Sequence, residues 1–197
     1  MSLIDAKSNP STKSELDLFA VPPTQVAIKR GFWEEIQPSN PVTNDGPYDF
    51  RIPPDPTYIQ LNKNYVYVQM VIKKPNVPAG VSIPKYAAIN LIGKTLFGQV
   101  KCWLNNKLAF DSSDKYAYKA FLETELNYGF DAKSSHLQSS LYFKESGTDV
   151  NTNDNDSFKN RAAFFKDDSI VEVTAPLHID IFSQDKYLLN YTDLKIE

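Results

Sequence analysis

The sequence predicts an all-β domain interrupted by a short helical insertion at about residues 113–142, and three observations carry this prediction. Aromatic residues make up 13% of the chain, a share that favours strands. Thirteen Pro against seven Gly fits many strand boundaries better than a helix bundle. From Tyr65 to Ile72 every residue but Gln69 is apolar or aromatic. Such a run predicts a central strand with both faces covered.

Strand patterns recur on both sides of the insertion. They cover residues 24–36, 48–52, 58–73, 96–104, 107–110, 170–182 and 191–197. The clearest pair is joined by Asn105-Asn106, because Asn tolerates the positive φ that a two-residue hairpin turn demands. Residues 1–14 are polar and unpatterned, so we expect a flexible arm followed by a single domain over 15–197. Residues 147–160 are Asn/Asp-rich and predict a surface loop with no contribution to the core.

The insertion carries a helical pattern with recognisable ends. Ser113 or Asp114 can cap its start, and Gly129 is placed to end it in a left-handed conformation. Its apolar residues at helical spacing are Tyr118, Phe121, Leu122 and Leu126. We expect this face, including Phe121 and Leu122, to be buried against the sheet. A ligand platform is the alternative for the aromatic set of Tyr116, Tyr118, Phe121 and Tyr128.

Composition excludes several classes of function. A net charge of −3, with no Lys/Arg cluster longer than a pair, argues against direct recognition of nucleic acid. No apolar run approaches the ~20 residues of a membrane span. The first residues lack the basic and apolar blocks of a secretory signal, so we expect a soluble intracellular protein with no membrane partner. Cys102 is the single cysteine, which rules out an intramolecular disulfide and suggests a small buried hydrophobe.

Two stretches imitate metal sites without completing a ligand set. His178-Ile179-Asp180 offers ligands at alternate strand positions, but the chain has only one other histidine, His136. Residues 149–155 start like a calcium loop, yet its sixth position is Asp154 rather than Gly and its twelfth is Asn160 rather than Glu. We therefore expect no metal and no other cofactor.

No motif for catalysis is present either. The chain lacks G-x-S-x-G, the P-loop and G-x-G-x-x-G, and its two histidines give no readable triad. Glu123 and Glu125 stand two residues apart on the expected helix, so they point in different directions and are interpreted as solvated surface. We expect no catalytic residue and no enzymatic activity.

Four segments carry a family resemblance. They are SELDLFAVPPTQ (14–25), YIQL (58–61), KYAYKAFLETELNYGFDAKSSHLQSSLYFK (115–144) and HIDIFSQDKYLLN (178–190). In these motifs and their order, the chain from Ser14 onward resembles the major capsid (hexon-like) protein of Polinton/Maverick elements and adintoviruses. The resemblance implies a jelly-roll β-sandwich, the first roll of a double jelly-roll subunit, and other capsid subunits as partners in a homotrimer. It also implies a place in the virion where capsids form.

The chain departs from that family in length. Two jelly rolls need roughly sixteen strands, so the chain is expected to hold only the first roll and to end before its last strand or strands. Residues 191–197 would then form an edge strand that recruits another chain. The predicted assembly residues are Leu18, Phe19, Tyr191, Leu194 and Ile196. Two alternatives remain: a transposon-derived host scaffold without a capsid role, and a lectin-like ligand-binding module.

Overall fold

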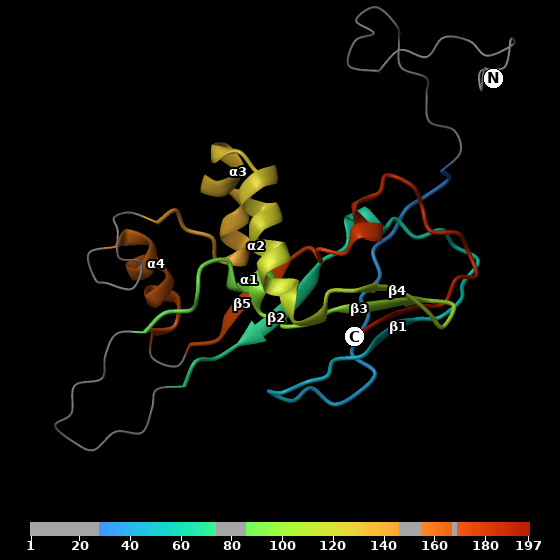
Figure 1. The fold of residues 1–197 in the computed structure, drawn as a ribbon, viewed down its shortest axis with the longest axis horizontal. Helices are drawn as coiled ribbons and strands as arrows, with labels where there is room; N and C mark the ends of the chain where they lie inside the picture. Colours follow the sequence, from blue (N-terminus) through green and yellow to red (C-terminus); the bar gives the residue numbers. More distant parts are fainter. Residues whose placement is uncertain (1–27, 74–85, 146–154, 167–168) are drawn as a thin grey trace, which may run out of the picture. The chain divides into compact units, whose positions relative to one another are not determined.

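The computed structural model describes residues 28–73, 86–145, 155–166 and 169–197, and Figure 1 draws them in colour. The chain divides into two units, Met1–Glu35 and Ile36–Glu197. Residues 28–36 form neither helix nor strand, so the prediction of a strand over 24–36 is wrong for these positions. Three predicted features lie outside the described residues: residues 24–27 of that strand, the arm 1–14, and the assembly residues Leu18 and Phe19.

The larger sheet has four antiparallel strands in the order β1-β6-β3-β4. Their bounds are β1 Phe50–Ile52, β3 Lys101–Leu104, β4 Lys107–Asp111 and β6 Leu194–Ile196. The hairpin β3–β4 confirms the predicted turn, since Asn105 and Asn106 have φ values of 48° and 63°. The short strand expected within 48–52 is also confirmed, as β1.

The last strand lies inside this sheet and not at its edge. Ile196 pairs with Phe50 of β1 on one side and with Cys102 of β3 on the other. The prediction that residues 191–197 form an edge strand is therefore wrong. A strand with neighbours on both sides has its backbone groups paired and cannot recruit a further strand.

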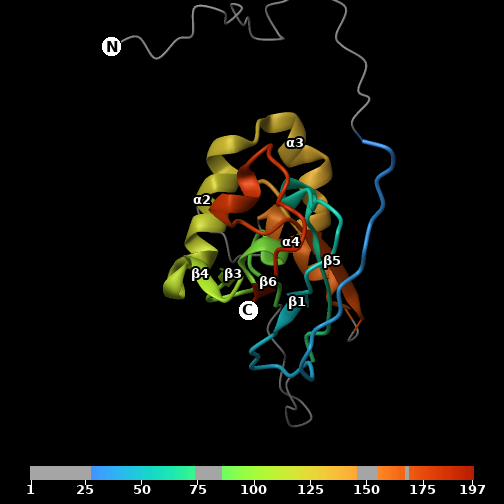
Figure 2. The same cartoon turned by 90° about the vertical axis from the view of Figure 1, so that its right-hand side faces the viewer.

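The second sheet has two antiparallel strands, β2 (Val66–Met70) and β5 (Val171–Ala175), which lie side by side in Figure 2. Val68 lies opposite Val173. The buried side of β5 alternates as its sequence predicts, because Val171, Val173 and Ala175 are buried. The fully covered central strand expected over 65–72 is wrong. β2 has a single partner strand among the described residues, and its side chains alternate between half-buried and exposed.

Four α-helices accompany the sheets in the described ranges: α1 Ile92–Thr95, α2 Tyr116–Asn127, α3 Phe130–Ser134 and α4 Asp156–Phe164. Short 3₁₀ helices occupy Leu61–Lys63, Ser113–Lys115, His136–Ser140 and Asp180–Ser183. The insertion is thus helical as predicted, but Gly129 has a φ of −74° and precedes α3 instead of ending α2 in a left-handed conformation. Neither Ser113 nor Asp114 caps α2 with its side chain. Among the residues that the structure describes, no helix has the length and apolar character needed to cross a membrane.

Helix α4 overturns the loop expected over 147–160. The Asn155 side chain accepts hydrogen bonds from the backbone N–H groups of Ser157 and Phe158, which caps the helix start. Phe158 and Phe165, nearly two turns apart, are both buried. Residues 147–154 of that prediction lie outside the described residues, but its last part is helix with core contacts.

The buried apolar residues form three clusters. The largest joins the four-stranded sheet to α2 and contains Leu61, Val100, Cys102, Tyr116, Ala120, Ile179, Phe182 and Leu194. A second lies under β5 and includes Leu141, Phe165 and Val173. The third packs Leu91, Leu137 and Tyr142 together.

These elements make the unit a mixed α/β structure, so the all-β jelly-roll prediction is wrong. The described residues form two small sheets, of four and two strands, alongside four α-helices. The apolar runs that predict long strands form only short strands in the structure. Residues 177–182, predicted as strand, form a loop that leads into a 3₁₀ helix. Strand propensity depends strongly on context, so a run of aromatic and β-branched residues also suits the irregular segments that cover a core.

Candidate functional site

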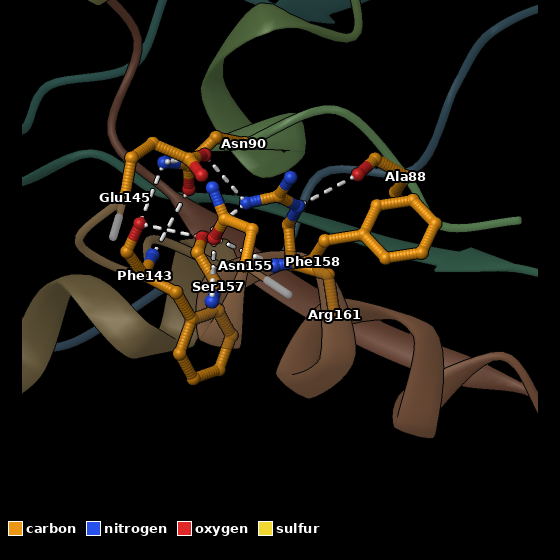
Figure 3. A network of polar contacts seen from close by, with 8 residues as sticks. All are labelled: Ala88, Asn90, Phe143, Glu145, Asn155, Ser157, Phe158 and Arg161. Atoms are coloured by element: carbon orange, nitrogen blue, oxygen red, sulfur yellow. Dashed lines mark hydrogen bonds and ion pairs between the residues drawn. The ribbon is translucent and has the colours of Figure 1, made fainter. Parts of the chain in front are cut away.

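A buried arginine organises one polar cluster, drawn in Figure 3. Arg161 of α4 directs its guanidinium at three acceptors: Nε donates to the carbonyl of Ala88 at 2.9 Å, and Nη1 donates to Glu145 Oε1 at 2.8 Å. Nη1 also donates to the hydroxyl of Ser157, one turn earlier on the helix. Only 4% of the Arg161 side chain is exposed. A charge so deeply buried needs a partner, and Glu145 supplies it.

The same cluster fastens the segment after the 3₁₀ helix 136–140 to the segment before α1. Asn90 Nδ2 donates to the carbonyl of Phe143 at 2.7 Å and to Glu145 Oε1 at 3.1 Å, while Asn90 Oδ1 accepts from the N–H of Phe143 at 2.9 Å. Ser157 Oγ donates to the Phe143 carbonyl at 2.8 Å. Glu145 Oε2 is buried with no hydrogen-bond partner among the described residues. The other polar groups bind one another, so the cluster holds the fold together.

A second cluster surrounds Lys94 of α1, of which 1% is exposed. Its Nζ donates to Thr124 Oγ1 of α2 at 3.1 Å and lies 4.7 Å from the centroid of the Tyr128 ring. Burial lowers the pKa of Lys94 to about 8, because a cation is poorly solvated there. A buried amine of low pKa is a feature of catalytic lysines. Here only 1% of Lys94 is exposed, so in this structure its amine is not accessible to a substrate in solvent.

His178 and Glu123 complete this second cluster. His178 Nδ1 lies 2.7 Å from Glu123 Oε2, and Nε2 is buried with no partner among the described residues. Burial lowers the pKa of His178; the hydrogen bond to Glu123 opposes that effect, and the Lys94 charge adds to it. Lys119 Nζ forms ion pairs with both Glu123 and Asp180, and it lies 2.6 Å from Asp180 Oδ1. This row of polar contacts, from His178 through Glu123 and Lys119 to Asp180, ties α2 to residues 178–180.

Some of the metal and carboxylate candidates named from the sequence lie in this row of contacts. His178 and Asp180 both lie there, but no group of three His, Cys, Asp or Glu side chains able to hold a metal ion occurs in the described part of the chain. Glu123 and Glu125 do point apart: Glu123 faces His178 and Glu125 accepts from Lys133 at 2.5 Å. Each is partly exposed, as a helix surface position would be, and each is also held in an ion pair, Glu123 with Lys119 and Glu125 with Lys133.

The single cysteine lies in the core, as its sequence context predicts. Cys102 is fully buried in strand β3. Burial raises the pKa of its thiol to about 11, because the thiolate is poorly solvated there. A thiol that stays protonated is a weak nucleophile, because the thiolate is the reactive form. Cys102 therefore contributes to packing and is not a reactive group.

The outward face of α2 and α3 is apolar. Its exposed fractions are 73% for Tyr118, 57% for Leu122, 82% for Leu126 and 68% for Phe130. We call Tyr118, Leu122 and Leu126, spaced four residues apart along α2, the α2 stripe. The prediction that this face is buried is wrong for Leu122, and Phe121 is 38% exposed.

A different set of α2 residues faces the interior: Tyr116 and Ala120 pack with sheet residues such as Cys102, and Thr124 binds Lys94 of α1. Tyr116, Ala120 and Thr124 are buried, and they too are spaced four apart. The hydroxyl of Tyr116 accepts from the backbone N–H of His178 at 3.0 Å, and burial raises the pKa of that phenol to about 12. The inner face therefore carries one large side chain, Tyr116, and two smaller ones, while the larger apolar side chains of the α2 stripe face solvent.

The predicted assembly residues are scattered by the fold. Leu194 is buried in the central strand β6, and Ile196 is half-buried in the same strand. Tyr191 is exposed, with a φ of 57°, and its N–H donates to the carbonyl of Asp55 at 2.8 Å. The three residues therefore do not form one surface. The α2 stripe is an exposed apolar surface of the kind expected for assembly. Its spacing is visible in the sequence, but from hydrophobicity alone the same residues are predicted to face the core.

Comparison with known proteins gives a distant relative. The chain is similar to "Uncharacterized protein F54H12.2" of Caenorhabditis elegans, with 29% identity over 185 residues. That match covers 89% of the chain and 42% of the relative, so the chain spans less than half of that protein's length. No family model matches the chain. No solved structure matches it.

Proposed function

We propose that this chain is a structural protein that acts by assembling with other protein subunits and catalyses no reaction. The observation that carries the proposal is the apolar surface of α2 and α3, where Tyr118, Leu122, Leu126 and Phe130 are more than half exposed. Contiguous apolar side chains on a surface mark sites of protein contact. The titratable side chains of the two polar clusters are instead engaged in contacts inside the fold.

The resemblance to the hexon-like capsid protein of Polinton/Maverick elements supports the same class of function, because such proteins work through contacts between subunits. We propose that the partners are other capsid subunits, with a trimer as the unit of assembly, and that no cofactor takes part. The proposed location is inside the cell and, where shells form, in the particle. The jelly-roll architecture implied by the resemblance is not part of this proposal.

The test is the state of association of the full chain. Sedimentation velocity over a hundredfold range of concentration should reveal a defined oligomer that grows in population with concentration. Electron microscopy of the concentrated protein should then show closed particles or regular arrays. A chain that stays monomeric throughout would contradict the proposal. A defined oligomer that never builds particles would contradict the capsid role and favour a host scaffold.

A further inference from the structure

We propose that the contact between α2 and residues 178–183 is a proton-sensitive latch, closed while His178 is neutral and opened when its imidazole takes up a second proton. Residues 178–183 comprise His178, Ile179 and the 3₁₀ helix Asp180–Ser183. The movement takes place within one chain, so it does not depend on the proposed function. It is built into the burial of one imidazole and the charges that face it.

The site of the His178 ring fits the neutral imidazole better than the imidazolium. Only 11% of this side chain is exposed, and Nδ1 lies 2.7 Å from Glu123 Oε2. A neutral ring that donates from Nδ1 carries no proton on Nε2. Nε2 is buried and has no hydrogen-bond partner among the described residues. Protonation would therefore create a buried cationic N–H for which the described residues provide no acceptor, and such a group is costly.

The surroundings of the ring also disfavour its cationic form. Burial is the main reason why the pKa of His178 in the folded chain lies below its ordinary value. The Glu123 carboxylate of α2 opposes that effect, whereas Lys94 of α1 and Lys119 of α2 add to it. Asp180, on the same segment as His178, pairs with Lys119. A state in which the ring reaches water therefore binds the second proton more readily than the closed latch does.

The segment 178–183 lies outside the sheets, which allows it to open locally. Strand β5 ends at Ala175, and residues 178–183 form no strand. The backbone N–H of His178 donates to the Tyr116 hydroxyl of α2 at 3.0 Å. Ile179 and Phe182 are buried in the largest apolar cluster. A segment held largely by side-chain contacts can separate from its neighbours while the strands stay paired.

Hydrogen exchange between pH 7.5 and pH 5.5 tests the latch, because most carboxylates stay ionised over that range. The readout is the protection factor, the exchange rate of an unstructured chain divided by that of the protein at the same pH. Peptides over residues 177–183 should lose protection as the pH falls. The loss should be at most about tenfold per pH unit, because opening takes up one proton. Peptides over β3 and β6 should keep their protection.

Three variants assign the effect to the imidazole. His178→Asn keeps an N–H donor near the position of Nδ1 but cannot take up a proton, so its latch should show no loss between pH 7.5 and pH 5.5. Lys94→Met removes one of the charges that disfavour the imidazolium, so its loss should be smaller without vanishing, since burial remains. His136→Asn, at an exposed histidine, is the matched control and should behave like the unmodified chain.

The single thiol of the chain gives a second readout. Cys102 is buried in the same apolar cluster as Ile179 and Phe182, so opening of the latch should make it more accessible. A dipyridyl disulfide, which reacts with thiols in mild acid, should label Cys102 several-fold faster at pH 5.5 than at pH 7.5. Each rate is divided by that of the urea-unfolded chain at the same pH. In His178→Asn the two ratios should be equal.

Several outcomes would overturn the latch. Equal protection of residues 177–183 at both pH values would do so, and so would a loss that persists in His178→Asn. If β3 and β6 lose protection together with residues 177–183, the response to acid is global unfolding and no local opening occurs. Should His178→Asn fail to fold, as circular dichroism would show, Lys94→Met decides: a loss as large as that of the unmodified chain would contradict the proposal.

Discussion

Arg161 and Glu145 form an ion pair inside the fold, with Nη1 2.8 Å from Oε1. The pair spans sixteen residues of sequence and joins α4 to the segment that follows the 3₁₀ helix 136–140. Because the same guanidinium also binds the Ala88 carbonyl, three separate segments meet at one side chain.

Removing this arginine should destabilise the protein strongly. Arg161→Ala leaves the Ala88 carbonyl without its donor and Glu145 without its positively charged partner, with only Asn90 still donating to Glu145. Breaking a buried pair in this way costs about 3–5 kcal/mol. We expect the lower end of that range, because 28% of the Glu145 side chain is exposed. Urea unfolding followed by circular dichroism measures the loss. Lys159→Ala, which breaks the exposed pair with Asp156, should cost about 0–1 kcal/mol. Equal losses of unfolding free energy in the two variants would show that the cluster of Figure 3 does not stabilise the fold.

His178 should make the protein less stable in mild acid. Burial lowers the pKa of His178 in the folded chain, so between neutral pH and about pH 5 the unfolded chain binds more protons at this residue. Stability from this group is therefore present above the ordinary histidine pKa of ~6.5 and is lost as pH falls through and below it.

Unfolding at pH 7.5 and pH 5.0 measures the effect. The free energy of unfolding should fall more for the unmodified chain than for His178→Gln. His136→Gln, at an exposed histidine, should behave like the unmodified chain. A His178→Gln variant with the same pH dependence as the unmodified chain would contradict the assignment of the effect to His178.

Lys94 should give the opposite trend in mild alkali. Its folded pKa of about 8 lies below the ordinary lysine pKa of 10.5, so the unfolded chain keeps a proton that the folded chain has lost. Stability should therefore rise from pH 8 to about pH 9. From about pH 9 the Cys102 thiol opposes this rise, because burial raises its pKa to about 11 and the folded chain then keeps a proton that the unfolded chain loses. Above pH 10 the phenols of Tyr116 and Tyr142, each with a pKa raised to about 12, reverse the trend. The rise should vanish in Lys94→Met and persist in Lys107→Met, at an exposed lysine. If stability still rises with pH in Lys94→Met, the rise comes from another titratable group.

The two faces of α2 should respond in opposite ways to substitution. Leu122→Ala on the outward face should change the free energy of unfolding of the monomer by no more than about 0.5 kcal/mol. Ala120→Leu adds bulk at a fully buried position and should cost about 1–3 kcal/mol. Urea unfolding at a concentration where the chain is monomeric makes the comparison. A large loss for Leu122→Ala would place that side chain in the core, contrary to its exposure.

Local chemistry explains which elements could be predicted from the sequence. The Asn105-Asn106 turn depends on the backbone freedom of two residues, and the hairpin around it follows. The alternation along 171–175 likewise identifies β5. Helix α2 was predictable as a helix, but two sets of its residues recur every four positions. Hydrophobicity favours the larger apolar set as the core face, whereas in the fold Tyr116, Ala120 and Thr124 are the buried residues, packed against the sheet and α1.

Long-range contacts explain what could not be predicted. Helix α4 lies in a stretch so rich in Asn and Asp that it resembles a loop, although Asn155 as a cap and the spacing of Phe158 and Phe165 were available as signals. The central position of β6 follows from pairing with β1 and β3, far away in the chain. The polar clusters around Lys94 and Arg161 depend on tertiary packing that no spacing reveals.

The central claim is that another copy of the chain covers the outward face of α2, and hydrogen exchange measured at two protein concentrations tests it most directly. Peptides within residues 116–130 should exchange more slowly in the concentrated sample than in the dilute one. Peptides over the central strands β3 and β6 should exchange equally in both. Slower exchange at high concentration confined to peptides outside 116–130, or no difference anywhere, would contradict the claim.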